Sequence, residues 1–300
     1  MSEVMSRRTF LKHAGVGAAV CAAGGLAVQP VLASEGTSSA NAWGVLVDLT
    51  RCNGCDSCAL ACKQANQRPD EDQIPEHLSS DAYSFVDRRV YVGDAGQEQQ
   101  MPVKRQCMHC LHPACVSACT VGALTKTPDG PVVYDSSKCI GCRYCQYACP
   151  FGVPTYDWAN PLGLIHKCQF CISRLDEGER PACVAGCPTG ALRFGTRNNL
   201  LAQAHSQIDS NPGRYIDQIY GEQELGGTSV LYLSGVPFAA MGLPTLDTQS
   251  PSRYAEAVMR KTPVIGLTVA ALATGAYWLT KRREFLSQPQ AVPQEVNHDR

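Results

Sequence analysis

Cysteine spacing is the feature that most limits what this chain can fold into. Of its 300 residues 17 are cysteine, and sixteen of these fall into four groups of four. Groups one and three keep the x2, x2, x3 spacing of bacterial ferredoxins. Their members are Cys52, Cys55, Cys58 and Cys62 in group one, and Cys139, Cys142, Cys145 and Cys149 in group three. Groups two and four, with longer loops, are Cys107, Cys110, Cys115 and Cys119, and Cys168, Cys171, Cys183 and Cys187.

The ferredoxin spacing has a physical reason. Three thiolates two residues apart let a tight loop wrap one 4Fe-4S cubane, while the fourth thiolate of the run ligates another cluster. Sixteen thiolates are enough for four 4Fe-4S clusters with none left over. We therefore expect all sixteen to be iron ligands. A three-iron cluster is not expected, because every group has its fourth cysteine.

Other uses of cysteine explain the pattern less well. A disulfide framework is compatible with an exported protein, but disulfides do not need x2 spacings repeated this tightly. Structural zinc uses Cys-x2-Cys pairs, yet a third cysteine at x2 and a fourth at x3 are superfluous for a tetrahedral site. A metal-binding module with a structural or redox-sensing function is a separate alternative, and it predicts few irons per chain.

The four groups form an internal repeat. Asp48 and Asp135 each precede the first cysteine of groups one and three by four residues. Groups two and four share the pattern Pro-Ala-Cys-Val-x2-Cys-x2-Gly-Ala-Leu, at residues 113–124 and 181–192. The order along the chain is therefore A-B-A-B, which indicates a duplication.

These patterns predict an α+β fold of duplicated bacterial ferredoxin-like domains over residues 43–197. Brief helices are expected after each third cysteine, and short strands at Gly44–Leu49, Pro131–Tyr134 and Leu192–Gly195. Residues 63–106, an insertion rich in Gln, Asp and Glu, are expected to form surface loops with one strand near Arg89–Val92. Residues 198–255 are expected to wrap the body, with a helix at Asn198–Gln207 and a strand at Ser229–Leu233, and show no evident chemistry.

The N-terminus predicts export. Residues 6–12 read Ser-Arg-Arg-Thr-Phe-Leu-Lys, which matches the twin-arginine signal at every fixed position, and an apolar stretch leads to a small-residue cleavage site at 31–33. We therefore interpret residues 1–33 as a signal peptide, with an uncleaved basic helix as the alternative. Cys21 is read as a small hydrophobe in this leader, because Val20 is a poor residue before a lipoprotein cysteine. The twin-arginine route moves folded proteins, so clusters inserted in the cytosol would be kept.

The C-terminal part predicts a membrane anchor. Residues 262–280 are uncharged over 19 positions, enough to span a hydrocarbon core of about 30 Å. Basic residues flank this segment on both sides, and Tyr277 and Trp278 suit a membrane interface. We expect a transmembrane helix with residues 281–300 as a cytoplasmic tail; the alternative is a buried core helix.

Composition and the remaining side chains argue against nucleic-acid binding and against catalysis. A net charge of -1 and a pI near 6.6 give no support to a nucleic-acid partner. No catalytic residue is evident. Histidines near the ligands are read as surface or packing residues before cluster hydrogen-bond donors, and they are His109, His112 and His166. Aromatic residues near the ligands are expected to pack and exclude water, and they are Tyr144, Tyr147 and Phe170.

In these motifs the chain resembles the four-cluster ferredoxin subunits of membrane oxidoreductases, a family that includes the beta subunits of formate dehydrogenase and dimethyl sulfoxide reductase. The match runs from about Trp43 to Gly195. The resemblance implies that group one pairs with group four and group two with group three, which spacing alone does not show. The implied ligands are Cys52, Cys55, Cys58 and Cys187 for cluster 1, Cys168, Cys171, Cys183 and Cys62 for cluster 2, Cys107, Cys110, Cys115 and Cys149 for cluster 3, and Cys139, Cys142, Cys145 and Cys119 for cluster 4.

Within that family, a leader combined with a C-terminal helix most resembles the iron-sulfur subunit of hydrogenase-2-type nickel-iron hydrogenases. The stretches at 105–110, 141–145 and 194–197 agree with it, while Thr120 departs from the proline that many relatives have there. The resemblance implies a non-catalytic electron-transfer subunit on the periplasmic side of the bacterial inner membrane. Its implied partners are the hydrogenase small and large subunits and a polytopic quinone-reactive membrane subunit.

A molybdopterin enzyme is the alternative partner. The beta subunit of formate dehydrogenase also has a C-terminal helix, but there the leader normally belongs to the catalytic subunit. A leader on this chain therefore favours the hydrogenase.

Overall fold

The computed structural model describes residues 42–93, 96–160 and 163–287. The predicted leader, Cys21 included, lies outside these ranges, as do residues 288–300 of the predicted tail. The strands are β1 (Trp43–Asp48), β2 (Phe85–Val92), β3 (Glu98–Arg105), β4 (Leu124–Lys126), β5 (Val132–Tyr134), β6 (Thr155–Tyr156), β7 (Ile165–His166), β8 (Leu192–Thr196) and β9 (Val230–Leu233). The helices are α2 (Ser57–Ala65), α3 (Ala114–Ser117), α4 (Tyr144–Ala148), α5 (Ile172–Asp176), α6 (Ala182–Ala185), α7 (Arg197–Ser210) and α8 (Ser252–Ser287), with 3-10 turns η1 (Ser136–Lys138) and η2 (Glu224–Gly226).

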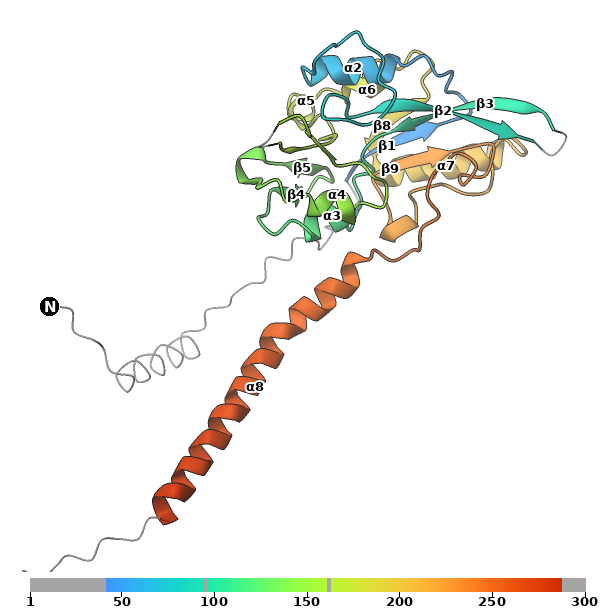
Figure 1. Cartoon of the computed structure of the whole chain (residues 1–300). Coiled ribbons are helices and arrows are strands. Elements are labelled where there is room, and N and C mark those ends of the chain that lie inside the picture. The colour runs from blue at the N-terminus through green and yellow to red at the C-terminus, as the bar shows by residue number, and fades with distance from the viewer. Residues whose placement is uncertain (1–41, 94–95, 161–162, 288–300) are drawn as a thin grey trace, which may run out of the picture. The chain divides into compact units, whose positions relative to one another are not determined.

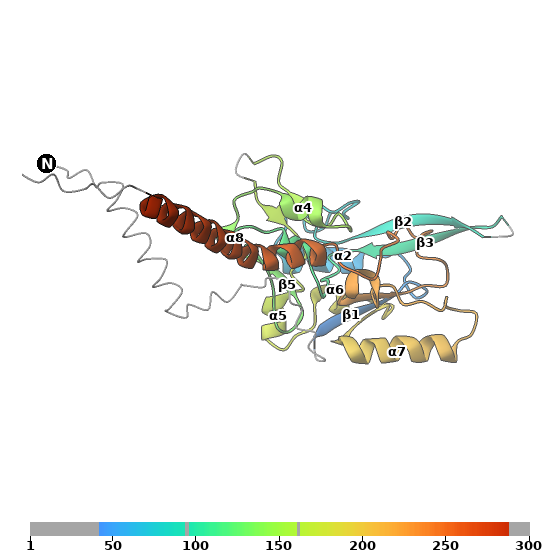
Figure 2. The same ribbon diagram turned by 90° about the horizontal axis from the view of Figure 1, so that it is seen from below.

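β1 is the central strand of a three-stranded sheet in the order β8-β1-β9 (Figure 1). It pairs antiparallel with β8 and parallel with β9. Its apolar run is buried on both faces: Leu46 packs with Leu200 of α7, while Val45 and Val47 belong to the cluster that includes Val103 of the β2-β3 hairpin. Figure 2 shows α7 and the hairpin on opposite sides of this sheet. β1, β8, β9 and α7 confirm the elements predicted in these segments.

A second strand pair stands next to the other two cysteine groups. β4 and β5 pair antiparallel, and β5 precedes group three as β1 precedes group one. α3 packs on α4, as α2 packs on α6. Groups one and four are thus brought together by β1 and β8, and groups two and three by β5 and β4. The strand predicted at Pro131–Tyr134 is confirmed. The brief helices predicted after each third cysteine are present, but each begins one residue before that cysteine and includes it.

The two ferredoxin-spaced groups also share their local geometry. The Asp48 carboxylate accepts a hydrogen bond from the backbone N–H of Thr50 at 3.1 Å, and that of Asp135 accepts one from Ser137 at 3.0 Å. These Asx turns aim the chain into the cysteine loop in the same way. Gly54, before the second cysteine of group one, has a φ of 75°, a left-handed conformation that an L side chain strains to adopt.

The insertion at 63–106 differs from the prediction. It forms a hairpin of two long strands, β2 and β3, rather than loops with one strand (Figure 1). The outer end of β3 is exposed, but Met101, Val103 and Lys104 are buried. The polar start of β3 and Pro102 in its middle hid the strand, because proline is unfavourable in a ladder.

The segment after α7 is built into the core. All four residues of β9 are buried, and the Tyr232 hydroxyl donates to the carbonyl oxygen of Lys104 at 2.7 Å. The backbone N–H of Ser229 donates to the carbonyl oxygen of Met108 at 3.1 Å. β9 therefore holds the beginning of group two against the main sheet.

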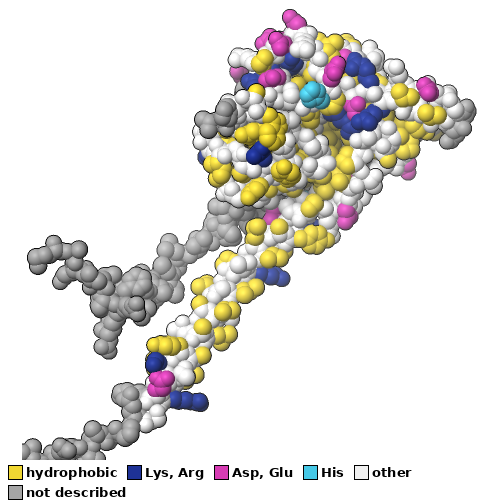
Figure 3. Space-filling model, in the orientation of Figure 1, with side chains coloured by type: hydrophobic (Ala, Val, Ile, Leu, Met, Phe, Trp, Pro, Cys, Tyr) yellow, Lys and Arg dark blue, Asp and Glu magenta, His cyan; other side chains and the backbone are white. Residues whose placement is uncertain are grey.

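α8 is a 36-residue helix. It is the one helix in the described ranges that is long and apolar enough to cross a membrane, with a mean hydropathy of 1.4 in its best window. Figure 3 shows hydrophobic side chains along its visible face. The hydroxyls of Thr262, Thr268, Thr274 and Thr280 each donate to the carbonyl oxygen four residues earlier. These polar groups are therefore satisfied within the helix, as a hydrocarbon environment requires.

Candidate metal centres

All sixteen grouped cysteines lie in the described ranges as free thiols. Burial and neighbouring thiols raise the pKa of Cys115 to about 12 and that of Cys145 to about 11. Such thiols do not ionise unaided near neutral pH. A metal that binds the thiolates would supply the missing positive charge.

The first set of cysteines lines a hollow at the end of the main sheet. Its members are Cys52, Cys55, Cys58 and Cys187. Burial raises the pKa of Cys52, and the other three thiols of this set raise it further. Cys187 differs: its pKa is lowered, because hydrogen bonds from Thr189 and from nearby backbone groups outweigh burial. Lys104, Asp56 and Pro188 are among the other residues that line this hollow.

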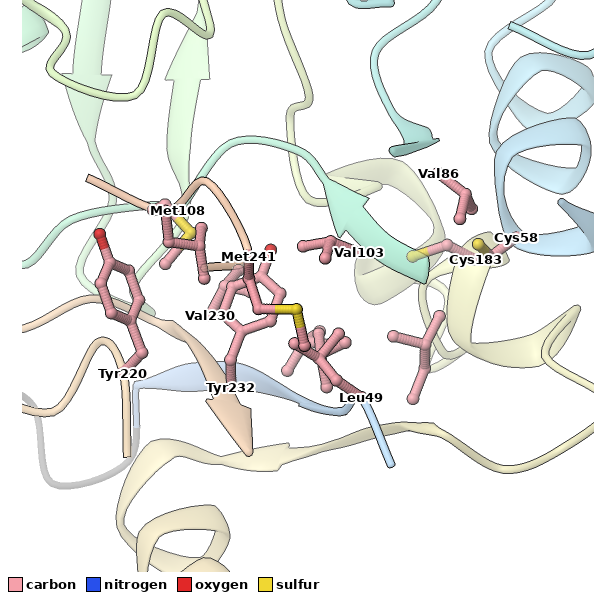
Figure 4. Close-up of a cluster of buried hydrophobic side chains, with 14 of the residues drawn as sticks. Leu49, Cys58, Val86, Val103, Met108, Cys183, Tyr220, Val230, Tyr232 and Met241 are labelled. Carbon is pink, nitrogen blue, oxygen red and sulfur yellow. The ribbon is translucent and has the colours of Figure 1, made fainter. Parts of the chain in front are cut away.

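The second set lines another hollow beside the first. Its members are Cys62, Cys168, Cys171 and Cys183. The backbone N–H of Phe170 donates to the Cys168 sulfur at 3.4 Å, and the Asn66 amide donates to the Cys62 sulfur at 3.7 Å. Figure 4 shows Cys58 of α2 and Cys183 of α6 with their sulfurs side by side at the end of the hydrophobic cluster.

The other eight cysteines fall into two further sets by electrostatic contact. Burial raises the pKa of Cys110, and the thiols that add to this are Cys107, Cys115 and Cys149. Burial also raises the pKa of Cys145, and the thiols of Cys119, Cys139 and Cys142 raise it further. Backbone N–H groups donate to the sulfurs of Cys119 at 3.2 Å and Cys139 at 3.4 Å.

Pairs of neighbouring thiols connect the four sets one after another. The thiol of Cys58 in the first set interacts with Cys183 in the second, and Cys168 in the second set interacts with Cys107 in the third. Cys115 in the third set interacts with Cys145 in the fourth. Each set therefore has an electrostatic neighbour in the next.

Lys104 lies fully inside the protein next to the first two sets. Its side chain is 1% exposed, and its Nζ has no hydrogen-bond partner among the described residues. Burial lowers its pKa, but the thiols of Cys58, Cys183 and Cys62 overcome this and raise it. An isolated buried ammonium is strongly unfavourable. Anionic iron-sulfur clusters on these thiolates would provide its counter-charge, so the residues present fit that group.

Two further lysines lie near the third set, Lys167, which is buried, and Lys126, which is half-buried. Lys167 Nζ donates to the carbonyl oxygens of Val132 and Cys168, and Lys126 Nζ donates to those of His109 and Gly130. His109 is buried, accepts a hydrogen bond from the Val132 N–H at Nδ1, and stacks edge-on against Phe170. Burial first, and then the two lysines, lower its pKa well below the usual value. His109 is therefore neutral and packs in the core.

The predictions for the aromatic side chains hold only in part. Phe170 is 3% exposed and packs between His109 and Phe194. Tyr144 and Tyr147, on α4, are 58% and 88% exposed, so the expectation that they pack and exclude water is wrong. Tyr144 is the first residue of the five-residue helix α4, in which Cys145 is the buried residue.

A single metal ion has no site among these cysteines. In the described ranges no group of three or more His, Cys, Asp or Glu side chains is arranged to hold one ion. The four thiolates around a cubane lie farther apart than the ligands of a single ion, because each thiolate binds a different iron. The three lysines near the sets were not singled out from the sequence, where the only signal is that Lys104 and Lys167 stand shortly before the first cysteines of groups two and four.

Comparisons with known proteins agree with this chemistry. Residues 99–197 match the 4Fe-4S dicluster domain family. A protein of Nitratidesulfovibrio vulgaris is 44% identical over 311 residues, covering 97% of this chain and 82% of the relative. The hydrogenase-2 operon protein HybA of Escherichia coli O157:H7 is 37% identical over 291 residues, covering 84% of this chain and 88% of HybA.

A second group of relatives serves another enzyme. The iron-sulfur subunit of the nitrate-inducible formate dehydrogenase of Escherichia coli K12 is 34% identical over 198 residues, covering 63% of this chain and 66% of that subunit. The family match, the HybA similarity and the sets of free thiols point to the same kind of protein. The chain belongs to the family of ferredoxin-type iron-sulfur subunits for electron transfer that contains HybA.

Proposed function

We propose that this chain relays electrons through four 4Fe-4S clusters between a hydrogenase catalytic module and a quinone-reactive membrane subunit. The observation that carries the proposal is that each of the four cysteine sets has a thiol close enough to interact with a thiol of the next set. A bound 4Fe-4S cluster supplies a centre that takes up and releases one electron. The chain's own residues hold the thiolates, exclude water around the buried ones and supply positive charge through buried lysines.

The proposed ligand sets are those that the resemblance implies. They are Cys52, Cys55, Cys58 and Cys187; Cys168, Cys171, Cys183 and Cys62; Cys107, Cys110, Cys115 and Cys149; and Cys139, Cys142, Cys145 and Cys119. Iron and acid-labile sulfide analysis of the purified full chain tests this. About four irons in each of four clusters, close to sixteen in total, is expected. Few irons per chain would favour a structural or sensing module instead.

The proposed location is the periplasmic side of the bacterial inner membrane. A leader at 1–33, a ferredoxin-like body at 43–197, an extension at 198–255, an anchor within α8 at 262–280 and a tail at 281–300 make up the proposed organisation. The apolar, exposed side chains of α8 support the anchor. Replacing both leader arginines, Arg7→Lys with Arg8→Lys, should leave the protein in the cytoplasm; normal export of this variant would contradict the leader assignment.

The hydrogenase partner is proposed from the similarity to HybA over 84% of the chain. A formate dehydrogenase partner is the second candidate, since the iron-sulfur subunit of that enzyme matches over 63% of the chain. Affinity purification of the tagged chain from detergent-solubilised membranes separates the two. A nickel-containing subunit is expected in the eluate; a molybdenum-containing one would move the assignment to the second candidate.

A further inference from the structure

Lys104 is a buried lysine whose charged group takes no part in the hydrogen bonding of the described chain. It is the next-to-last residue of β3, and its side chain is 1% exposed. In the described part of the chain no carbonyl, carboxylate or hydroxyl oxygen accepts a hydrogen bond from its Nζ. Three other lysines lie near cysteines, the buried Lys63 and Lys167 and the half-buried Lys126, and each donates to two backbone carbonyl oxygens. Lys104 therefore does not serve to tie the backbone together.

The position of Lys104 relates it to two cysteine sets at once. It lines the hollow of the first set. Its charge also interacts with Cys62 and Cys183 of the second set, as well as with Cys58 of the first. Cys58 and Cys183 lie side by side, so a charge that faces both is close to both sets (Figure 4).

A buried positive charge favours the more negative of two redox states. Reduction adds an electron to a cluster, and Coulomb attraction to a nearby cation is weakly screened away from water. The potential of an iron-sulfur cluster depends on charge, hydrogen bonds and solvent exposure. A cation that lies close to two clusters therefore raises the midpoint potential of each.

We propose that Lys104 is a counter-charge shared by the first and second clusters, and that it raises the reduction potential of both. The proposal rests on the proposed function, because it needs clusters on the first two cysteine sets. Lys104 acts through the clusters and is a positioning charge, without a chemical step of its own. Its side chain is buried and lines the same hollow as Val47 and Val86, and methionine reproduces most of its volume without the charge.

The test is a redox titration followed by electron paramagnetic resonance on the detergent-solubilised full complex. Lys104→Met removes the charge, Lys104→Arg keeps it, and Lys138→Met is the control. Lys138 stands next to Cys139, but its side chain is 58% exposed and is ion-paired with Asp135, so water screens its charge. Reference variants Cys55→Ser and Cys171→Ser identify the signals of the first and second clusters.

Lys104→Met should lower the midpoint potentials of those two clusters and leave the other two unchanged. We expect about a tenfold change in the ratio of reduced to oxidised cluster at a fixed potential, which is about 59 mV for a one-electron couple. Lys104→Arg should keep the midpoint potentials of both clusters close to the wild-type values. Lys138→Met should leave all four potentials unchanged. Loss of both clusters from Lys104→Met with full retention in Lys104→Arg would also support the shared charge.

Other outcomes overturn the proposal. Unchanged potentials in Lys104→Met, a shift in one cluster only, or equal effects of the methionine and arginine variants would each exclude a shared charge. Iron content separates this failure from that of the proposed function. A wild-type chain with far fewer than about sixteen irons contradicts the four clusters, whereas a fully loaded wild type with unmoved potentials in Lys104→Met contradicts only the role of Lys104.

Discussion

The strand pair that flanks groups one and four is longer and better covered than the pair that flanks groups two and three. β1 pairs with β8 and β9, and its two faces pack in separate hydrophobic clusters. β4 and β5 form a two-stranded ladder over a small cluster that includes Val132 and Ile165. We call these the first and second regions. An isolated two-stranded hairpin is marginally stable. Without clusters, the second region therefore has much less packing than the first to hold its cysteines in place.

The buried cations differ in the same direction. In the first region Lys104 makes no hydrogen bond within the described ranges, although the buried Lys63 donates to the carbonyl oxygens of Asp70 and Gln73. Lys126 and Lys167, which contact the second region, both donate to backbone carbonyl oxygens. The first region is held by hydrophobic packing, and Lys104, unlike Lys63, is left to act on charge alone. The second region uses its lysines as part of the scaffold. Four predictions test this contrast.

Removal of iron should have the largest effect. In the chelated full chain we expect backbone amides of α3, β4, β5 and α4 to lose nearly all protection from hydrogen exchange, because metal binding and folding are coupled where little core exists. Amides of β1 and β9 should keep most of theirs. Hydrogen exchange with mass spectrometry of the loaded and chelated chain measures both. Equal loss in the two regions would break the comparison.

Core truncations should separate the regions next. Leu46→Ala in the first region and Ile165→Ala in the second each remove a fully buried side chain, at a cost of about 2–5 kcal/mol. Leu46→Ala should lower the thermal midpoint of both the loaded and the chelated chain. Ile165→Ala should lower it only in the loaded chain, because the second region is already unfolded without iron. An equal effect of Ile165→Ala in both forms would contradict that reason.

Lysine replacement gives a smaller effect. Lys167→Met leaves the carbonyl oxygens of Val132 and Cys168 without this donor, which should cost about 1–3 kcal/mol. Lys104→Met leaves no such acceptor behind. It should therefore change the cluster potentials but lower the thermal midpoint less than Lys167→Met does. Differential scanning calorimetry of the loaded chains compares the two variants. A larger loss of stability in Lys104→Met would reverse the assigned roles.

The smallest effect is expected at Tyr147. With 88% of the residue exposed, Tyr147→Ala should change stability by no more than about 0.5 kcal/mol and leave the iron content as it is. Phe170→Ala is the matched comparison, because Phe170 is buried at the junction of His109 and Phe194. Iron analysis and thermal melts of both variants provide the measurement. Iron loss in Tyr147→Ala would show that this exposed ring protects a cluster.

Local sequence patterns predicted the elements that carry a strong signal of their own. β1, β5, β8 and β9 are short apolar runs, and α7 follows its residue pattern closely. The Asx turns at Asp48 and Asp135 follow from a repeat visible in the sequence. These features depend on neighbours in the chain, which is why residue order alone was sufficient.

Long-range features were hidden from the sequence. The parallel pairing of β1 with β9 joins segments far apart in the chain, and neither segment specifies its partner. The burial of Lys104 depends on segments far apart in the chain, such as those of Val47 and Leu192, although lysine is almost never fully buried. The pairing of the cysteine groups came from family resemblance, since x2 and x3 spacings are the same whichever group completes a set.

The place of β9 has a consequence for how this protein is made. The main sheet contains the first and the last strand of the described chain, so a ribosome must release nearly the whole body before that sheet can close. Until then one edge of β1 offers unpaired backbone groups to other chains. Truncation before Val230 leaves that edge open permanently, and only a fully translated chain removes this risk of aggregation.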